Sequence, residues 1–225
     1  EKEKFITAKE QVRGLSKKDS ISQITNLRKQ LDSSIQNYEQ KLSEKHKGTY
    51  FGDFINLKNE KILKDPPLAS NGKIDSLKVY RYYRSHFWDG INFKDDAITR
   101  NPFFASKLKS YFDNVIVKHP DSVAVEMDKI MLKPLQGSLL YKLLLAHFTS
   151  TYETYNVMGF DKVFVYIADN YFKTGKAVGT YEDDVIEKII KRSDKLKPLL
   201  IGAVAPDLSM IKAEDRPKIA SKGFE

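Results

Sequence analysis

Apolar residues along most of the chain recur three or four positions apart, which is the spacing of one face of an α-helix. The pattern is clearest between residues 19 and 42, where a narrow apolar stripe runs through otherwise polar positions. A narrow stripe favours packing against a single neighbour. That neighbour is either a helix of the same chain, in a hairpin that we favour, or a coiled-coil partner on a second chain. We expect residues 1–47 to form this long N-terminal helical arm.

The densest group of aromatic residues lies between residues 79 and 120 and contains the single tryptophan, Trp88. Buried tyrosine and tryptophan side chains usually need hydrogen-bond partners. Arg84 falls on the apolar face of its predicted helix, where a charge must be paired or reach solvent. We therefore predict a structural or interaction network in this stretch. Its members are Tyr82, Arg84, His86, Trp88, Asp89, Asp95, Asp96 and Arg100.

Prolines mark where two helices of this region begin. Asn101 followed by Pro102 is an N-cap followed by proline at the first helical position. The pair His119-Pro120 is interpreted as a stop, after which Asp121 or Ser122 caps the next helix. The most apolar helix is expected at residues 138–155 and should be the most buried.

No alternation typical of β-strands occurs between residues 16 and 198. The predicted fold class is therefore all-α: an irregular bundle or array of about seven or eight helices. Antiparallel helical hairpins build this array, which is at most similar to tetratricopeptide repeats because no fixed repeat period is present. Residues 1–198 form the predicted helical domain, with its main bundle at 76–198, and a short extended tail follows.

Composition narrows the function classes. The 225 residues contain no cysteine, which excludes disulfides, thiolate metal sites and cysteine nucleophiles within them. The net charge is +8, but 30 acidic residues are interspersed with 38 basic ones, so we expect a solvated basic surface and no nucleic-acid partner. No apolar run approaches the roughly 20 residues that a membrane span needs.

Candidate chemistry is sparse. One alternative is a small-molecule-binding or hydrolytic domain centred on Arg84, His86, Trp88 and Asp89, which predicts an open pocket with converging polar groups. Otherwise the same groups satisfy one another within the fold. Asp95 and Asp96 are interpreted as cap and turn residues rather than as a cation site. The four histidines lie far apart in the sequence, and no metal, cofactor or catalytic residue is predicted.

At Leu199 the pattern changes, and a resemblance becomes specific. The pattern G-x-x-A-P-D-L, Gly202 to Leu208, resembles the opening of the TlpA-like thioredoxin family. The preceding region resembles the helical domain of unknown function that sits ahead of the thioredoxin domain in envelope thiol-disulfide oxidoreductases of Bacteroidetes. The matching motifs are Tyr82–Asp89, Asp95–Asp96, Arg100–Phe103, Pro120–Ser122, Met158–Val165 and Lys197–Gly202.

This resemblance implies a non-catalytic scaffold that positions a tethered, C-terminal thioredoxin-like domain. Residues 199–225 would then be a linker and the truncated start of that domain. The parent protein is expected in the cell envelope, on the periplasmic side, with membrane contact only through a lipid anchor. Client proteins, or a second copy contacting the N-terminal helix, are further candidate partners. The chain itself is not expected to be an enzyme because it lacks the family's redox cysteines.

Overall fold

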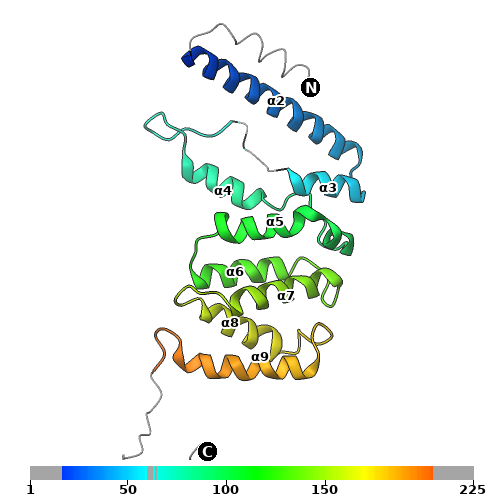
Figure 1. The fold of residues 1–225 in the computed structure, drawn as a ribbon, viewed down its shortest axis with the longest axis vertical. Coiled ribbons are helices and arrows are strands. Elements are labelled where there is room, and N and C mark those ends of the chain that lie inside the picture. The colour runs from blue at the N-terminus through cyan, green and yellow to red at the C-terminus, as the bar shows by residue number, and fades with distance from the viewer. Residues whose placement is uncertain (1–16, 60–62, 64, 205–225) are drawn as a thin grey trace, which may run out of the picture. The chain divides into compact units, whose positions relative to one another are not determined.

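The computed structural model describes residues 17–59, 63 and 65–204. In this part of the chain there are eight α-helices and no β-strand, which confirms the predicted all-α array (Figure 1). The α-helices are α2 (Lys17–Lys45), α3 (Tyr50–Lys58), α4 (Ser76–His86), α5 (Pro102–Ser110), α6 (Pro120–Met131), α7 (Leu139–Glu153), α8 (Asp161–Ile167) and α9 (Asp183–Leu196). Short helical turns complete the set: η1 (Asp96–Arg100), η2 (Tyr111–Val115), η3 (Ala168–Phe172) and η4 (Lys197–Leu199).

The two proline-marked helix starts differ in outcome. Asn101 caps α5 by accepting a hydrogen bond from the backbone N–H of Phe103 at 2.9 Å, as predicted. The prediction for α6 is wrong by two or three residues, because Pro120 is its first residue rather than a stop before it. His119 is the N-cap, and its Nδ1 accepts from the Asp121 N–H at 3.3 Å. Proline is favoured at a first helical position, where its missing N–H has no partner to lose.

The described part of α2 packs on α3. Glu39 pairs with Lys58, and Ser43 Oγ donates to Asn56 Oδ1 at 2.8 Å. Residue numbers rise along α2 as they fall along α3, so the two helices run antiparallel, as the favoured hairpin requires. Positions 1–16 of the predicted arm lie outside the described residues.

The chain divides into two compact units, residues 1–145 and 146–225, and the division falls inside α7. In the first unit α4, α5 and α6 lie one beside the next (Figure 1). The large side chains of this core are at most 4% exposed: Phe87 directly after α4, Phe104 and Leu108 on α5, Tyr111 on η2, and Met127 and Ile130 on α6. Burial of such apolar surface is the main stabilising term of the fold.

In the second unit α8 continues without a break into η3, a turn with π-helical hydrogen bonding. Its core includes Phe160, Phe164, Ile167 and Phe172. The chain leaves α9 through η4 and reaches Leu200 in an extended conformation. The rest of the predicted tail, residues 205–225, lies outside the described residues. The predicted limit between helical domain and linker therefore stays a prediction.

Candidate functional site

Glu126 is a buried acid on the inward face of α6. It follows Val123 by three positions and precedes Ile130 by four, so it shares their side of the helix. Both neighbours are at most 2% exposed, and Glu126 itself is 4% exposed. A buried carboxylate must find donors for its oxygens.

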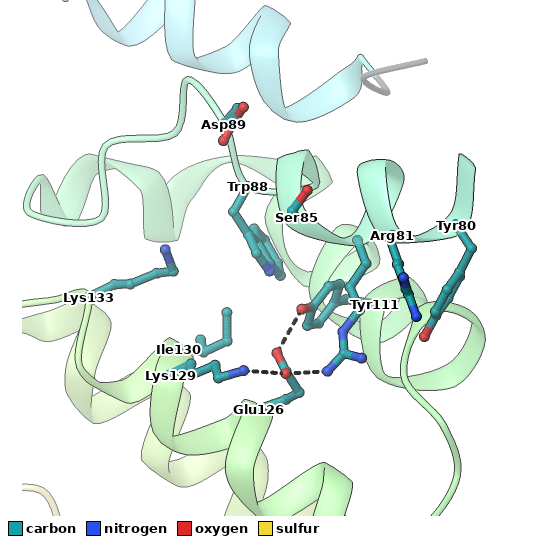
Figure 2. Close-up of a pocket in the computed structure, with 11 residues that line it drawn as sticks. Tyr80, Arg81, Ser85, Trp88, Asp89, Tyr111, Glu126, Lys129, Ile130 and Lys133 are labelled. Carbon is teal, nitrogen blue, oxygen red and sulfur yellow. Dashed lines mark hydrogen bonds and ion pairs between the residues drawn. The ribbon is translucent and has the colours of Figure 1, made fainter. Parts of the chain in front are cut away.

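Three side chains donate to Glu126. Its Oε1 accepts from the guanidinium of Arg84 and from Lys129 Nζ at 2.8 Å, and its Oε2 accepts from the Tyr111 hydroxyl at 2.9 Å (Figure 2). We call these four residues the Glu126 network. Because Arg84 lies on α4, Tyr111 on η2, and Glu126 and Lys129 on α6, the network connects three separate elements of the first unit.

The network holds Glu126 in its ionised form. Burial by itself raises the pKa of Glu126, but the hydrogen bonds from Lys129, Arg84 and Tyr111 outweigh it and leave the pKa below its ordinary value. Burial, and then the contact with Glu126, raise the pKa of the Tyr111 hydroxyl. A carboxylate with a lowered pKa and three donors is a weak proton acceptor, so this acid is poorly suited to general base catalysis.

Trp88 lies beside the network. It is 9% exposed, and its ring packs edge-on against Phe87, Phe93 and Tyr111, with centroid separations of 5.0, 5.5 and 5.2 Å. The indole Nε1 is buried and has no hydrogen-bond partner among the described residues. Leaving a buried donor unpaired costs about 1–3 kcal/mol. Trp88 therefore brings an unsatisfied N–H to this site.

A groove of about 580 Å³ opens between α4 and α6, with Trp88 in its wall (Figure 2). This volume falls in the range of small-molecule binding sites. Its charged lining residues are Arg81, Arg84, Lys129 and Lys133, opposed by Asp89 and Glu126. The groove is therefore open and predominantly basic.

Of the eight residues predicted to form one network, the structure brings only Arg84, Trp88 and Asp89 to this groove. His86 is not among its lining residues. It stacks on Tyr82 with centroids 4.0 Å apart, and its Nδ1–H donates to the Tyr82 carbonyl at 2.9 Å. His86 thus closes its own turn of α4 instead of facing Arg84 and Asp89.

The other predicted members are helix caps or lie on the surface. Asp95 accepts from the Ala97 N–H at 2.9 Å and caps η1. Asp96 accepts from the Leu140 and Leu139 N–H groups at 2.9 and 3.0 Å, so it caps the distant helix α7. These backbone hydrogen bonds hold the pKa of Asp96 below its usual value. Arg100 is exposed at the end of η1.

The predicted network left out the other eight lining residues of the groove: Tyr80, Arg81, Ser85, Tyr111, Glu126, Lys129, Ile130 and Lys133. One feature of the sequence could have identified Glu126. It shares the apolar face of α6 by its helical spacing, so an acid at this position is expected to be buried. Arg84 required a partner, and Glu126 required a cation. The two lie 42 residues apart in the sequence, however, and nothing local relates them.

The part of the chain that the structure describes contains no cluster of three or more histidine, aspartate or glutamate side chains arranged to hold a metal ion. None of its helices has both the length and the apolar character that crossing a membrane requires.

Comparison with known proteins gave one family. The model described as "Domain of unknown function (DUF5106)" matches residues 67–193, which is more than half of the chain. The match includes α4 to α8 and most of α9, and therefore the whole groove. It confirms the resemblance to a helical domain of unknown function, but it does not extend to Gly202–Leu208. No curated protein and no solved structure matched the chain.

Proposed function

Because the chain belongs to the family described as Domain of unknown function (DUF5106), we propose that it is a non-catalytic helical interaction domain. In this proposal it positions a thioredoxin-like domain that follows it in the parent protein. The parent performs thiol-disulfide exchange in the cell envelope, and the helical domain supplies a rigid base and a surface for partners. Client proteins are the partners that such a surface would hold.

The main support for this proposal is the segment that follows α9, residues 199–204, which we call the α9 exit. Leu199, Ile201 and Val204 are apolar residues with exposed fractions of 63%, 72% and 92%. They immediately precede or belong to the G-x-x-A-P-D-L pattern, of which positions 205–208 lie outside the described residues. Exposed apolar side chains that gather in one place often mark an interaction surface. A folded domain directly after this segment would cover them.

The polar residues support the non-catalytic part of the proposal. The Glu126 network and the Asp95 and Asp96 caps use their polar atoms to join elements of the fold. Thiol-disulfide exchange requires a thiolate, and the 225 residues contain no cysteine. Redox chemistry would therefore belong to the following domain.

The first test is the gene's reading frame beyond Glu225. We expect a Cys-x-x-Cys motif within a thioredoxin-like sequence there. A stop codon, or an unrelated domain, would overturn the proposal. An insulin-reduction assay should then show turnover by the parent protein and none by the 225-residue chain alone.

The second test concerns positioning. In the parent protein, Leu199, Ile201 and Val204 are replaced by serine, and small-angle X-ray scattering reports the distribution of interdomain distances. We expect a broader distribution, with the insulin-reduction rate of the thioredoxin-like domain unchanged. The matched control replaces Val178, which is 69% exposed in the same unit, by serine and should leave scattering unchanged. Equal scattering from both variants would count against a positioning role.

A further inference from the structure

The polar groups left free in the groove are nearly all donors. The Trp88 Nε1–H has no acceptor among the described residues, and Arg84 uses one terminal nitrogen for Glu126. The Tyr111 hydroxyl donates to Glu126, and both oxygens of that carboxylate already accept hydrogen bonds within the network. The exposed Asp89 is the remaining acid of the lining. A ligand that fits this groove must therefore bring acceptors.

The charges of the lining residues also favour an anionic ligand. Four basic side chains line the groove against two acidic ones, and Glu126 is already neutralised by Arg84 and Lys129. Arg81 and Lys133 make no ion pair within the described part of the chain, although Lys133 Nζ lies 5.3 Å from the Phe93 ring centre. They stand on either side of Trp88 in Figure 2. Two uncompensated cations flanking a concave surface attract an anion.

The groove also offers apolar surface. The rings of Tyr80 and Trp88 and the side chain of Ile130 belong to its lining. The Tyr80 hydroxyl donates to the Val115 carbonyl at 2.8 Å, which holds that ring in place. Rigid aromatic walls together with a few converging polar groups are typical of small-molecule sites. The bound species should therefore combine an anionic head with a flat, apolar body.

We propose that the groove between α4 and α6 binds a small organic anion, in which a carboxylate or phosphate group is joined to a ring. The oxyanion lies on the side of the groove that Arg81 and Arg84 line, the ring packs against Trp88, and Lys133 on the other side of Trp88 adds to the attraction for an anion. The unpaired Trp88 N–H is nine-tenths buried and directed into this groove (Figure 2), so it is the donor that a ligand acceptor would satisfy. Because Nε1 is closed to water, seating an acceptor there requires a small displacement of the groove wall.

This site is independent of the proposed positioning role, since it needs neither a following domain nor the α9 exit. We also expect this site to bind its ligand without catalysing a reaction. Glu126 is held ionised by its three donors, and His86 lies away from the groove. We therefore expect the ligand to be released unchanged.

Trp88 provides a direct readout, because it is the single tryptophan of the chain. Its indole N–H gives one resonance in a ¹H–¹⁵N spectrum. The 225-residue chain is titrated with benzoate, with phenyl phosphate and with neutral benzyl alcohol as the matched control. We expect saturable shifts of the indole resonance with either anion, at dissociation constants of about 1 mM or below, and at least tenfold weaker binding of benzyl alcohol. The two anions distinguish a carboxylate site from a phosphate site.

Variants test the assignment. Arg81→Gln and Lys133→Gln each remove a cation that makes no ion pair among the described residues, so the fold should be unaffected. We expect each to weaken anion binding about threefold, and the double variant about tenfold. Lys118→Gln, an exposed lysine elsewhere in the same unit, should leave binding unchanged. Raising the salt concentration should weaken binding of the anions but not of benzyl alcohol.

Three results would overturn the proposal. The first is a non-saturating shift with both anions. The second is equal affinity for benzyl alcohol, which would indicate an apolar pocket. The third is equal weakening by Lys118→Gln, which would indicate diffuse attraction to a basic surface. Circular dichroism of each variant confirms that the fold is retained, so loss of binding is not confused with unfolding.

Discussion

The two units each contain a cluster of lysine or arginine with acidic side chains, and the clusters differ in burial. In the first unit the Glu126 side chain is 5% exposed and is held by three donors from α4, η2 and α6. In the second unit Asp169 is 27% exposed and lies between Lys173, at 2.8 Å, and Lys197, at 2.7 Å. Lys173 also pairs with Asp194, whose side chain is 54% exposed.

Because both clusters pair acidic residues with lysine or arginine, their different burial should determine how much each ion pair contributes to stability. Asp169 and its two lysine partners keep 27%, 32% and 56% of their side-chain surface exposed, so water screens their ion pairs more than those of Glu126. Glu126 is buried, so each of its donors must stay in place. The contribution of the first cluster to the free energy of unfolding should therefore be large and insensitive to salt. The contribution of the second cluster should be small and should decrease as salt is added.

The largest effect is expected from Glu126→Ala. It leaves the Arg84 guanidinium and the Tyr111 hydroxyl without their acceptor in a buried setting. Breaking a buried ion pair costs about 3–5 kcal/mol, and because Arg84 is partly exposed we expect about 2–4 kcal/mol here. Urea denaturation followed by circular dichroism measures the change in free energy of unfolding.

Glu126→Gln is the matched control for shape. It keeps the volume and one acceptor oxygen and should cost clearly less than alanine. If both variants fall within about 0.5 kcal/mol of the wild type, the range of ordinary surface substitutions, then the network contributes nothing to stability.

The second largest effect is expected from lowering the pH, which should reduce the contribution of the Glu126 network to the free energy of unfolding. The folded-state pKa of Glu126 lies below the unfolded value of about 4.5, so the folded protein favours its ionised form. Its stabilising contribution is present above that pH and is lost as the pH falls through the lower, folded-state pKa. Unfolding free energies measured from pH 6 to pH 3 should fall less steeply for Glu126→Gln than for the wild type. Parallel curves would show that Glu126 does not titrate differently on folding.

Tyr111→Phe removes one donor and leaves Glu126 with Arg84 and Lys129. We expect a loss of about 1 kcal/mol in unfolding free energy, the usual net value of one hydrogen bond. Tyr141→Phe is the control, because the Tyr141 hydroxyl is buried without a partner in the described structure. Its removal should be neutral or slightly stabilising. Equal losses from the two variants would mean that removing a buried hydroxyl, and not the contact with Glu126, determines the result.

The smallest effect is expected from Asp169→Asn. Exposed ion pairs contribute about 0–1 kcal/mol and are screened by salt. Thermal melts at 0.05 and 1 M NaCl should show a small difference from wild type at low salt and none at high salt. Glu126→Ala should remain destabilised at both salt concentrations. A salt-independent loss for Asp169→Asn would remove the distinction between the clusters.

Local sequence signals predicted helix starts unevenly, for a physical reason. Asn101-Pro102 was interpreted correctly because both residues favour the same local structure, a cap and a first helical residue. At His119-Pro120 proline again occupies the first helical position. Asp and Ser are more common N-cap residues than His, so the sequence predicted the cap at Asp121 or Ser122 instead of His119. Which residue caps depends on where the helix must begin to bury Val123 and Met127, and that is a tertiary condition.

The candidate site shows the same limit. Arg84 and Trp88 were expected in one network, and the structure places both at the groove. His86 was expected with them because it is adjacent in sequence, but on α4 it stacks on Tyr82. Asp96 was expected to act locally and instead caps α7, more than 40 residues away.

The helical class, the start of α5 and the need of Arg84 for a counter-charge can be read from the residues alone. These follow from spacing, proline and the cost of burying a charge, all of which act over a few residues. That Glu126 meets the need of Arg84, and that Arg81 and Lys133 flank an unpaired indole N–H, depends on the folded arrangement. Such pairings depend on how α4 packs against α6, and packing is set by the whole helical face rather than by any residue within reach along the chain.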